Sequence, residues 1–316
     1  FGIPGPLYPV AREGMRLHRD LSRALPEETG VNTEYRERPT LTLAFDETEV
    51  REAKAGLAWK QEQEGYTVSW CDAEQARAVE PRISPEALGA VHILETAEVE
   101  PYRFVLALAQ ASEKLGATIR HGRVTGLKRE HGRVTGVSLE RGEIQCDRVV
   151  LAMGPWSGEA SAWLDIPVEV RPLKGQILRL RAPGAPFQCS IGWAGNYATT
   201  KPDGLLWAGT TEEEAGFDDS PTTEARDQVM ASLLKMVPSV DDAELVEQTA
   251  CLRPLPSDGM LLLGSVSGWD GLYLSTGAGR KGIGLGPAMG RITADLVIKG
   301  ATDIPIDAFD PGRFAR

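Results

Sequence analysis

Five glycines within ten residues form the part of the sequence best suited to hold a charged ligand. They occupy positions 277, 279, 282, 284 and 286, after a strand-like apolar run and before a helix predicted from Leu285 to about Ile298. Glycine lets backbone N–H groups come close to a ligand, and a helix N-terminus carries a partial positive charge. The segment therefore predicts a loop that binds an anionic or polarised ligand through its backbone.

Two basic residues, Arg280 and Lys281, lie inside this loop. They are either solvated surface charges or contacts to a phosphate or to the edge of a cofactor ring. The residues alone do not decide between these two interpretations.

A second strand, glycine and helix pattern lies far from the first. Residues 147–154 read as a buried strand that ends in Gly154, and Pro155 is well placed to begin a helix. Two such patterns far apart in the sequence predict one nucleotide site built by a discontinuous domain.

Arg253 is the best candidate for binding a carboxylate. It follows a strand-like run, and Pro254 and Pro256 restrict the chain around it. The planar guanidinium can hold a carboxylate through two hydrogen bonds, but an ion pair with Asp258 is the alternative. Tyr197, near the start of a strand, either shares that carboxylate through its hydroxyl or only packs.

Cys251 precedes Arg253 by two residues, so it either points into the same cavity or belongs to the opposite face of the strand; a small buried side chain is the commoner case. Other catalytic groups find little support. Ser157 lacks a Gly-x-Ser-x-Gly turn, and the histidines at 18, 92, 121 and 131 lack an acid at a telling spacing, so they are expected to be structural or exposed.

Composition excludes several classes of protein. The net charge of −11 over 316 residues opposes nucleic-acid binding. Four cysteines without a CxxC pair, together with four histidines, indicate neither a disulfide framework nor a metal site, and they favour a reducing, cytoplasmic location. No apolar run approaches the length of a membrane span, and any N-terminal signal would lie outside this sequence, which begins in turn-forming residues.

The remaining pattern predicts two interleaved layers. The first part of the chain reads as helices and short strands. Helices are expected at 10–25, 46–64 and 101–115, with a short helix after Asp72. A strand is expected at 41–45, and three β segments at 117–121, 124–130 and 133–140 form a meander before residue 149. From residue 168 longer alternating strands predict an antiparallel platform; its strands are expected at 176–181, 196–200, 205–209, 244–252 and 260–263, with a helix at 222–236.

Several motifs in this order resemble the flavin-dependent D-amino-acid oxidase superfamily, and most of all its glycine oxidase and sarcosine oxidase branch. The resemblance covers nearly the whole chain and rests on Val-Val-Leu-Ala-Met-Gly-Pro-Trp-Ser at 149–157, Arg-Pro-Leu-Lys-Gly-Gln at 171–176, Asp-Gly at 203–204 followed by Gly209 and Gly-Phe-Asp at 216–218, Arg-Pro at 253–254, Ser-Asp-Gly at 257–259, and the glycine-rich segment 271–291. It implies an α/β (α+β) fold in which an FAD/NAD(P)-binding Rossmann-like domain interleaves with an antiparallel-sheet substrate domain.

The resemblance assigns residues 1–33, 98–165 and 252–316 to the FAD-binding domain and residues 34–97 and 166–251 to the substrate-binding domain. The family's first βαβ unit, with Gly-x-Gly-x-x-Gly, does not occur in this sequence, so the FAD-binding domain is expected to be N-terminally incomplete. Because that unit supports the FAD pyrophosphate, weak FAD binding by this chain alone is one expectation.

The resemblance also implies roles for individual residues. Arg253 would bind the substrate carboxylate, with Tyr197 assisting it. The residues expected to contact FAD are Val124, Gly154, Trp156, Cys251, Gly279, Arg280, Lys281, Gly282, Ile283 and Gly284. A cysteine at what matches position 251 is bonded to flavin in monomeric sarcosine oxidases, whereas glycine oxidases carry a small residue there; we expect non-covalent FAD.

The implied reaction is oxidation of the C–N bond of glycine, sarcosine or a D-amino acid by hydride transfer to FAD, with oxygen as acceptor and hydrogen peroxide as product. A dehydrogenase that passes electrons to a quinone or carrier protein, and a non-catalytic subunit that needs a separate FAD-binding partner, are the alternatives. The expected partners are a small amino-acid substrate and, as a homo-oligomer, further copies of the chain.

Overall fold

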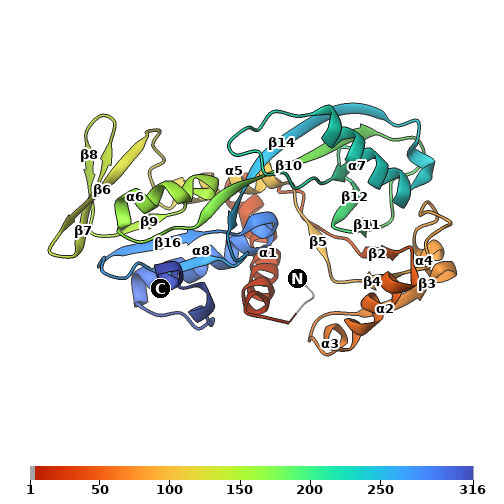
Figure 1. Ribbon diagram of the computed structural model, residues 1–316, viewed down its shortest axis with the longest axis horizontal. Helices are drawn as coiled ribbons and strands as arrows, with labels where there is room; N and C mark the ends of the chain where they lie inside the picture. Colours follow the sequence, from red (N-terminus) through yellow and green to blue (C-terminus); the bar gives the residue numbers. More distant parts are fainter. Residues whose placement is uncertain (1–3, 316) are drawn as a thin grey trace.

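The computed structural model describes residues 4–315, which form two lobes side by side (Figure 1). The helices belong to both lobes. They are α1 (Leu7–Thr29), α2 (Glu47–Ala55), α3 (Leu57–Gln61), α4 (Ala73–Val79), α5 (Pro101–Lys114), α6 (Ser161–Leu164), α7 (Thr223–Met236) and α8 (Gly282–Lys299), with 3-10 turns η1 (Gly154–Ala160), η2 (Pro238–Val240), η3 (Gly279–Lys281), η4 (Asp307–Phe309) and η5 (Pro311–Ala315).

A mixed eight-stranded sheet forms one lobe. All of its neighbouring strands are antiparallel except the parallel pair β11 and β2. In spatial order the strands are β14 (Glu244–Pro256), β10 (Val170–Arg181), β13 (Leu206–Gly209), β12 (Asn196–Thr200), β11 (Ser190–Trp193), β2 (Thr40–Ala44), β4 (Gly89–Ile93) and β3 (Val68–Asp72). Helix α7 covers this sheet, and Leu178, Ile191, Leu206 and Leu233 are buried between the two.

The other lobe contains two small sheets and the helices around them (Figure 1). One sheet has the order β15-β16-β9, in which β16 and β9 are parallel, and the other is the antiparallel meander β6-β7-β8. Their strands are β9 (Val149–Leu151), β15 (Leu262–Ser265), β16 (Leu272–Thr276), β6 (Val124–Glu130), β7 (Arg133–Leu139) and β8 (Glu143–Gln145); a separate short pair joins β1 (Arg36–Glu37) to β5 (Ala97–Glu98).

The long strands β10 and β14 connect the two lobes. They pair from Val170 opposite Pro256 to Arg181 opposite Glu244, so one continuous ribbon runs out of the eight-stranded sheet. Its far end is packed into the second lobe, where Val170 is buried with Leu262 and Leu274 of the smaller sheet. This ribbon therefore places part of the large sheet next to the glycine-rich loop.

The first long helix extends further than the sequence pattern predicts. Pro26 does not end α1 but lies inside it, and Gly30 ends the helix in a left-handed conformation with φ 76°. The predicted helix 46–64 is two helices, because the chain is interrupted at Gly56. Asp72 caps α4 as expected, since its side chain accepts hydrogen bonds from the backbone of Glu74 and Gln75.

Other expectations about strands were wrong in detail. Residues 117–121 form no strand, and β8 at 143–145 supplies the third strand of the meander. The segment after Gly154 is a 3-10 helix rather than an α-helix. Strands β3, β4 and β11 were not predicted, because they are short and gain their stability from neighbouring strands that are remote in sequence.

Candidate functional site

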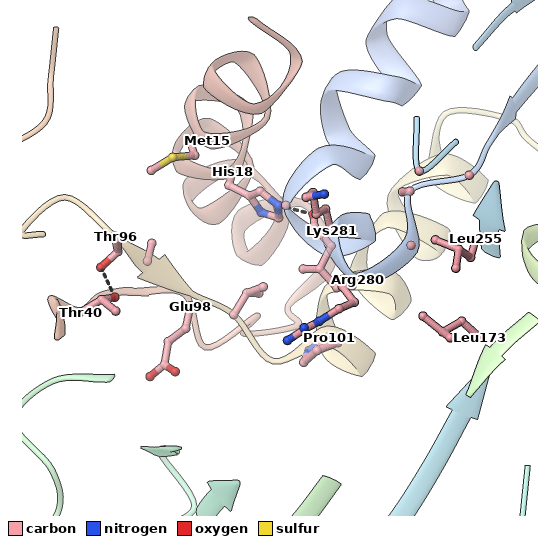
Figure 2. A pocket seen from close by; sticks show the side chains of 18 of the residues that line it. Met15, His18, Thr40, Thr96, Glu98, Pro101, Leu173, Leu255, Arg280 and Lys281 are labelled. Atoms are coloured by element: carbon pink, nitrogen blue, oxygen red, sulfur yellow. Dashed lines mark hydrogen bonds between the residues drawn. The ribbon is translucent and has the colours of Figure 1, made fainter. Parts of the chain in front are cut away.

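The main cavity has a volume of about 910 Å³ and lies where the two lobes meet. Its walls come from helix α1, from the chain around β5 and the start of α5, from Leu173 of β10 and Leu255 of β14, and from the glycine-rich loop (Figure 2). This volume is in the range of sites that hold cofactors or drug-sized ligands. The cavity therefore contains the loop that the sequence analysis singled out.

The glycine-rich loop makes a tight turn before α8. Gly277 and Gly279 have φ angles of 85° and 52°, which side chains rarely tolerate, and a Cβ on Gly277 would lie 2.6 Å from Cγ of Pro256. Gly282 differs, since its φ of −53° is an ordinary helical value. No side chain caps the N-terminus of α8, so the backbone N–H groups of its first turn are available to a ligand in the cavity.

Both basic residues of the loop line the cavity. The Arg280 guanidinium lies 2.9 Å from the carboxylate of Glu212 and donates a hydrogen bond to the carbonyl of Gly195. Arg280 thus connects the loop to segments that flank strands of the large sheet, and its side chain lines the cavity (Figure 2).

Arg253 lies within strand β14, not on a connection after it as predicted. One terminal nitrogen lies 2.6 Å from Oγ1 of Thr210 and the other lies 3.1 Å from the carbonyl oxygen of Thr211. The guanidinium covers Gly175 of β10, where a Cβ would lie 1.9 Å from it. Asp258 is not its partner, because that carboxylate pairs with Arg313 at 2.7 Å.

The register of the sheet places Arg253 and Tyr197 on the same face. Arg253 is opposite Leu173 on β10, while Tyr197 and Ile177 are both opposite Gly209 on the strand between them. Side chains that are directly opposite, or two residues apart along one strand, point to the same side of a sheet. Arg253 therefore adjoins Leu173 of the cavity wall, and Tyr197 shares this face two strands away from Leu173; neither residue lines the main cavity itself.

Tyr197 is held as a neutral phenol. Burial raises its pKa to about 12, while the positive charge of Arg253 acts in the opposite direction. At neutral pH its hydroxyl can therefore donate a hydrogen bond to an anion bound by Arg253.

Residues on the opposite face of β10 hold in place residues 210–213, the segment whose threonines contact Arg253. The backbone N–H of Gln176 lies 2.9 Å from Oγ1 of Thr211, and the Gln176 side chain lies 3.0 Å from the carboxylate of Glu213. Lys174 is fully buried on the same face, with Nζ 3.4 Å from the carboxylate of Asp218. These buried polar contacts make the position of the guanidinium well defined.

Cys251 is exposed, which contradicts the expectation of a small buried residue. It lies opposite Gly175 and two residues before Arg253, so it shares the face of Arg253. The structure therefore removes the reverse-face alternative for this cysteine.

A second cavity, of about 650 Å³, contains Val124 and Trp156. Gly154 begins the 3-10 turn that carries Trp156, and its φ of 56° favours glycine. The Trp156 ring is stacked on Phe217 with ring centroids 5.9 Å apart, and both rings are about half exposed. Most of the predicted cofactor residues thus line one of two cavities, whereas Gly154, Cys251 and Gly282 line neither.

The residues of the main cavity fit the flavin end of FAD. The positive-φ glycines bring backbone close to the cavity, an uncapped helix N-terminus faces it, and Arg280 and Lys281 supply positive charge. Among residues 4–315 no cluster of histidine, cysteine and acidic side chains could hold a metal ion, and none of the helices described there could cross a membrane.

Sequence reasoning missed several groups at the site. Thr210, Thr211 and Glu212 follow β13 as a polar run, a signal that could have marked them as contacts of a ligand site. Glu98 lines the cavity and lies 3.2 Å from Nζ of Lys201. Glu98 also accepts a hydrogen bond from Thr199, 101 residues away, and Thr210 contacts Arg253, 43 residues away. Contacts over such separations have no local sequence signal.

Comparisons with known proteins show the family of this chain. The family model of FAD dependent oxidoreductases, DAO, matches residues 2–296. Glycine oxidase of Pseudomonas putida is 32% identical over 325 residues, which cover 99% of this chain and 86% of that protein, and glycine oxidase of Pseudomonas aeruginosa is 31% identical over 307 residues, with 94% and 83% covered. The crystal structure of glycine oxidase from Geobacillus kaustophilus superposes with a TM-score of 0.94 at 27% identity, covering 99% of this chain and 85% of that one. The chain belongs to the DAO family of FAD-dependent oxidoreductases.

Proposed function

We propose that the protein oxidises the C–N bond of a small amino acid, such as glycine, sarcosine or a D-amino acid, with FAD as hydride acceptor and oxygen as final acceptor. The observation that carries this proposal is the setting of Arg253. Its guanidinium lies over Gly175, held by Thr210 and Thr211, on the sheet face that adjoins the main cavity. A fixed planar cation beside a cofactor-sized cavity suits a substrate that carries a carboxylate.

The proposed roles follow from this arrangement. Arg253 binds and orients the substrate carboxylate, and the neutral Tyr197 hydroxyl donates to the same group. An amine that binds in its neutral form needs no protein base. No histidine or acidic residue is predicted from the sequence for that role. The product imine reacts with water to give an oxo acid and ammonia, or an aldehyde and a smaller amine.

Bound FAD would supply two-electron oxidation, with oxygen as the acceptor that is reduced to hydrogen peroxide. In this proposal the residues that hold it are Val124, Gly154, Trp156, Cys251, Gly279, Arg280, Lys281, Gly282, Ile283 and Gly284. The segments 1–33, 98–165 and 252–316 form the FAD-binding domain, and 34–97 with 166–251 form the substrate-binding domain. The four free cysteines favour action in the reducing environment of the cytoplasm.

The test is a substrate survey with FAD added to the full chain. Glycine, sarcosine and D-alanine are supplied in turn, with L-alanine for comparison, while peroxide and the oxo acid or aldehyde are measured in air. A parallel anaerobic series follows loss of the oxidised-flavin absorbance, with an artificial electron acceptor added last. We expect equal amounts of peroxide and carbonyl product with at least one of the three substrates.

Two results would change the proposal. Substrate-dependent bleaching without peroxide in air would identify a dehydrogenase that uses another acceptor. Bound FAD that none of these amino acids reduces would refute amino-acid oxidation by this chain.

A further inference from the structure

Helix α8 contains a proline close to its N-terminus, which leaves one backbone carbonyl without its usual partner. In a regular helix the N–H of residue 287 would donate to the carbonyl of Ile283 four residues earlier. Residue 287 is a proline and has no N–H. Ile283 is 39% exposed as a residue, and its carbonyl lies in a partly buried contact where a donor from elsewhere in the molecule can satisfy it.

His18 of α1 supplies that donor. Its Nε2 lies 2.7 Å from the carbonyl oxygen of Ile283, and because a carbonyl can only accept, Nε2 carries the proton. The imidazole is buried, with only 8% of its surface exposed, and it packs on Phe104 of α5 with ring centroids 4.7 Å apart. One side chain thus joins α1 and α5 to the first turn of α8.

The two helices approach closely enough for this contact because of a glycine. Gly14 lies about one turn before His18, and a Cβ at position 14 would be 2.2 Å from the carbonyl oxygen of Gly284. The backbones of α1 and α8 are therefore in direct contact next to the hydrogen bond, so neither helix end can shift independently.

His18 and Lys281 both line the main cavity (Figure 2). Ile283 and Gly284 line it as well. Burial lowers the pKa of His18, and the hydrogen bond to Ile283 opposes this effect. The neutral imidazole is therefore the form present near pH 7. It keeps a donor on Ile283 without adding a third positive charge to the wall that carries Arg280 and Lys281.

We infer that His18 is a positioning residue for the ligand loop: its Nε2–H takes the place of the N–H that Pro287 lacks, and it fixes the first turn of α8 so that the backbone N–H groups there face the cavity. That the ligand is FAD rests on the proposed function. The effect of His18 on the loop does not.

The first test measures, in the full chain without FAD, amide hydrogen exchange of residues 286 and 288–290, whose N–H groups donate within the first turns of α8. We expect His18→Leu to accelerate exchange of these amides about fivefold, the effect of losing about one net hydrogen bond. His18→Gln, whose amide can reach the same carbonyl, should restore most of the protection. His92→Leu is the matched control, because His92 is a partly buried strand residue outside the main cavity.

Pro287→Ala makes this test specific, since it gives α8 its own N–H for the carbonyl of Ile283. In the Pro287→Ala background, loss of His18 should change exchange of residues 286 and 288–290 less than twofold. Equal acceleration by His18→Leu in both backgrounds, or none in either, would overturn the inference. Should His18→Leu not fold, His18→Ala, which also removes the donor, is compared in the two backgrounds and decides in the same way.

The second test measures the dissociation constant for FAD by fluorescence. We expect a rise of at least about fivefold in His18→Leu, with little change in His18→Gln and His92→Leu. Equal affinity in all three variants, in a protein that binds FAD, would refute a role in cofactor positioning. If the unaltered chain binds no FAD, the proposed function fails, and hydrogen exchange still decides the role of His18 in the loop.

Discussion

Replacement of Arg253 is the most direct test of the substrate site. Arg253→Ala removes a guanidinium that two threonine contacts, at 2.6 and 3.1 Å, hold over Gly175. A bidentate, charge-assisted contact with a carboxylate is worth about 2–4 kcal/mol, which corresponds to a loss of roughly 30- to 1,000-fold in kcat/KM.

The effect should appear mainly in KM, because the carboxylate keeps its charge through the reaction, so its contact with Arg253 stabilises the bound substrate as well as the transition state. Arg253→Lys keeps the charge but offers a single ammonium instead of a planar fork, so we expect a smaller loss, about tenfold. Arg181→Ala is a matched control: Arg181 ends β10 at the protein surface, where it pairs with Glu244.

The assay is steady-state kinetics with the best amino-acid substrate, together with a spectral titration of bound FAD with acetate as a simple carboxylate. Acetate should bind the unaltered protein and Arg181→Ala equally, and Arg253→Ala much more weakly. A kcat/KM for Arg253→Ala within threefold of the unaltered value, at normal FAD content, would refute the assignment of this residue.

Three further outcomes follow from the geometry of the site. Gly279→Val should lower FAD occupancy, because a φ of 52° is strained for valine. Gly282→Val should lower it only if the new side chain reaches the ligand, because φ at Gly282 is helical and the nearest atom to an added Cβ is 3.9 Å away. The flavin content per purified chain measures both effects. Cys251 should leave FAD non-covalent, so acid precipitation should leave the yellow colour in the supernatant, and a yellow pellet would contradict this. The pKa of Tyr197 is raised from 10.0 to about 12 in the folded state, so its contribution to stability is complete below pH 10 and is lost as the pH rises through 12. Tyr197→Phe should therefore flatten the decline in the free energy of unfolding between pH 10 and 12. An unchanged decline would count against a buried phenol.

Local elements followed well from sequence patterns. The helix predicted at 222–236 is α7 at Thr223–Met236, with Thr222 as its cap, and the strand, glycine and helix pattern after residue 271 is β16, the loop and α8. Periodicity, capping residues and turn residues act over a few positions, so these elements are visible in the sequence alone. The family resemblance added the FAD-dependent oxidoreductase assignment, which the comparisons confirm.

The extent of the long strands was harder to predict. The expected strand 176–181 starts at Val170, and Arg253 lies inside β14 despite the prolines at 254 and 256. Proline disfavours a strand interior because it cannot donate to the ladder, yet this pairing of β10 with β14 continues to Pro256 at the edge of the sheet. The neighbouring strand, rather than local propensity, decides where such a strand ends.

The sequence alone determined which residue types are present at the site: the glycines of the loop, the cations beside them, Arg253 and Tyr197. The tertiary structure decided which of them meet. Sheet register places Arg253 and Tyr197 on one face and exposes Cys251, and the crossing of α1 with α8 brings His18 to Ile283 across 265 residues. Turn and helix preferences depend on neighbouring residues, whereas register and helix crossings depend on the packing of the whole core, which no short stretch of sequence specifies.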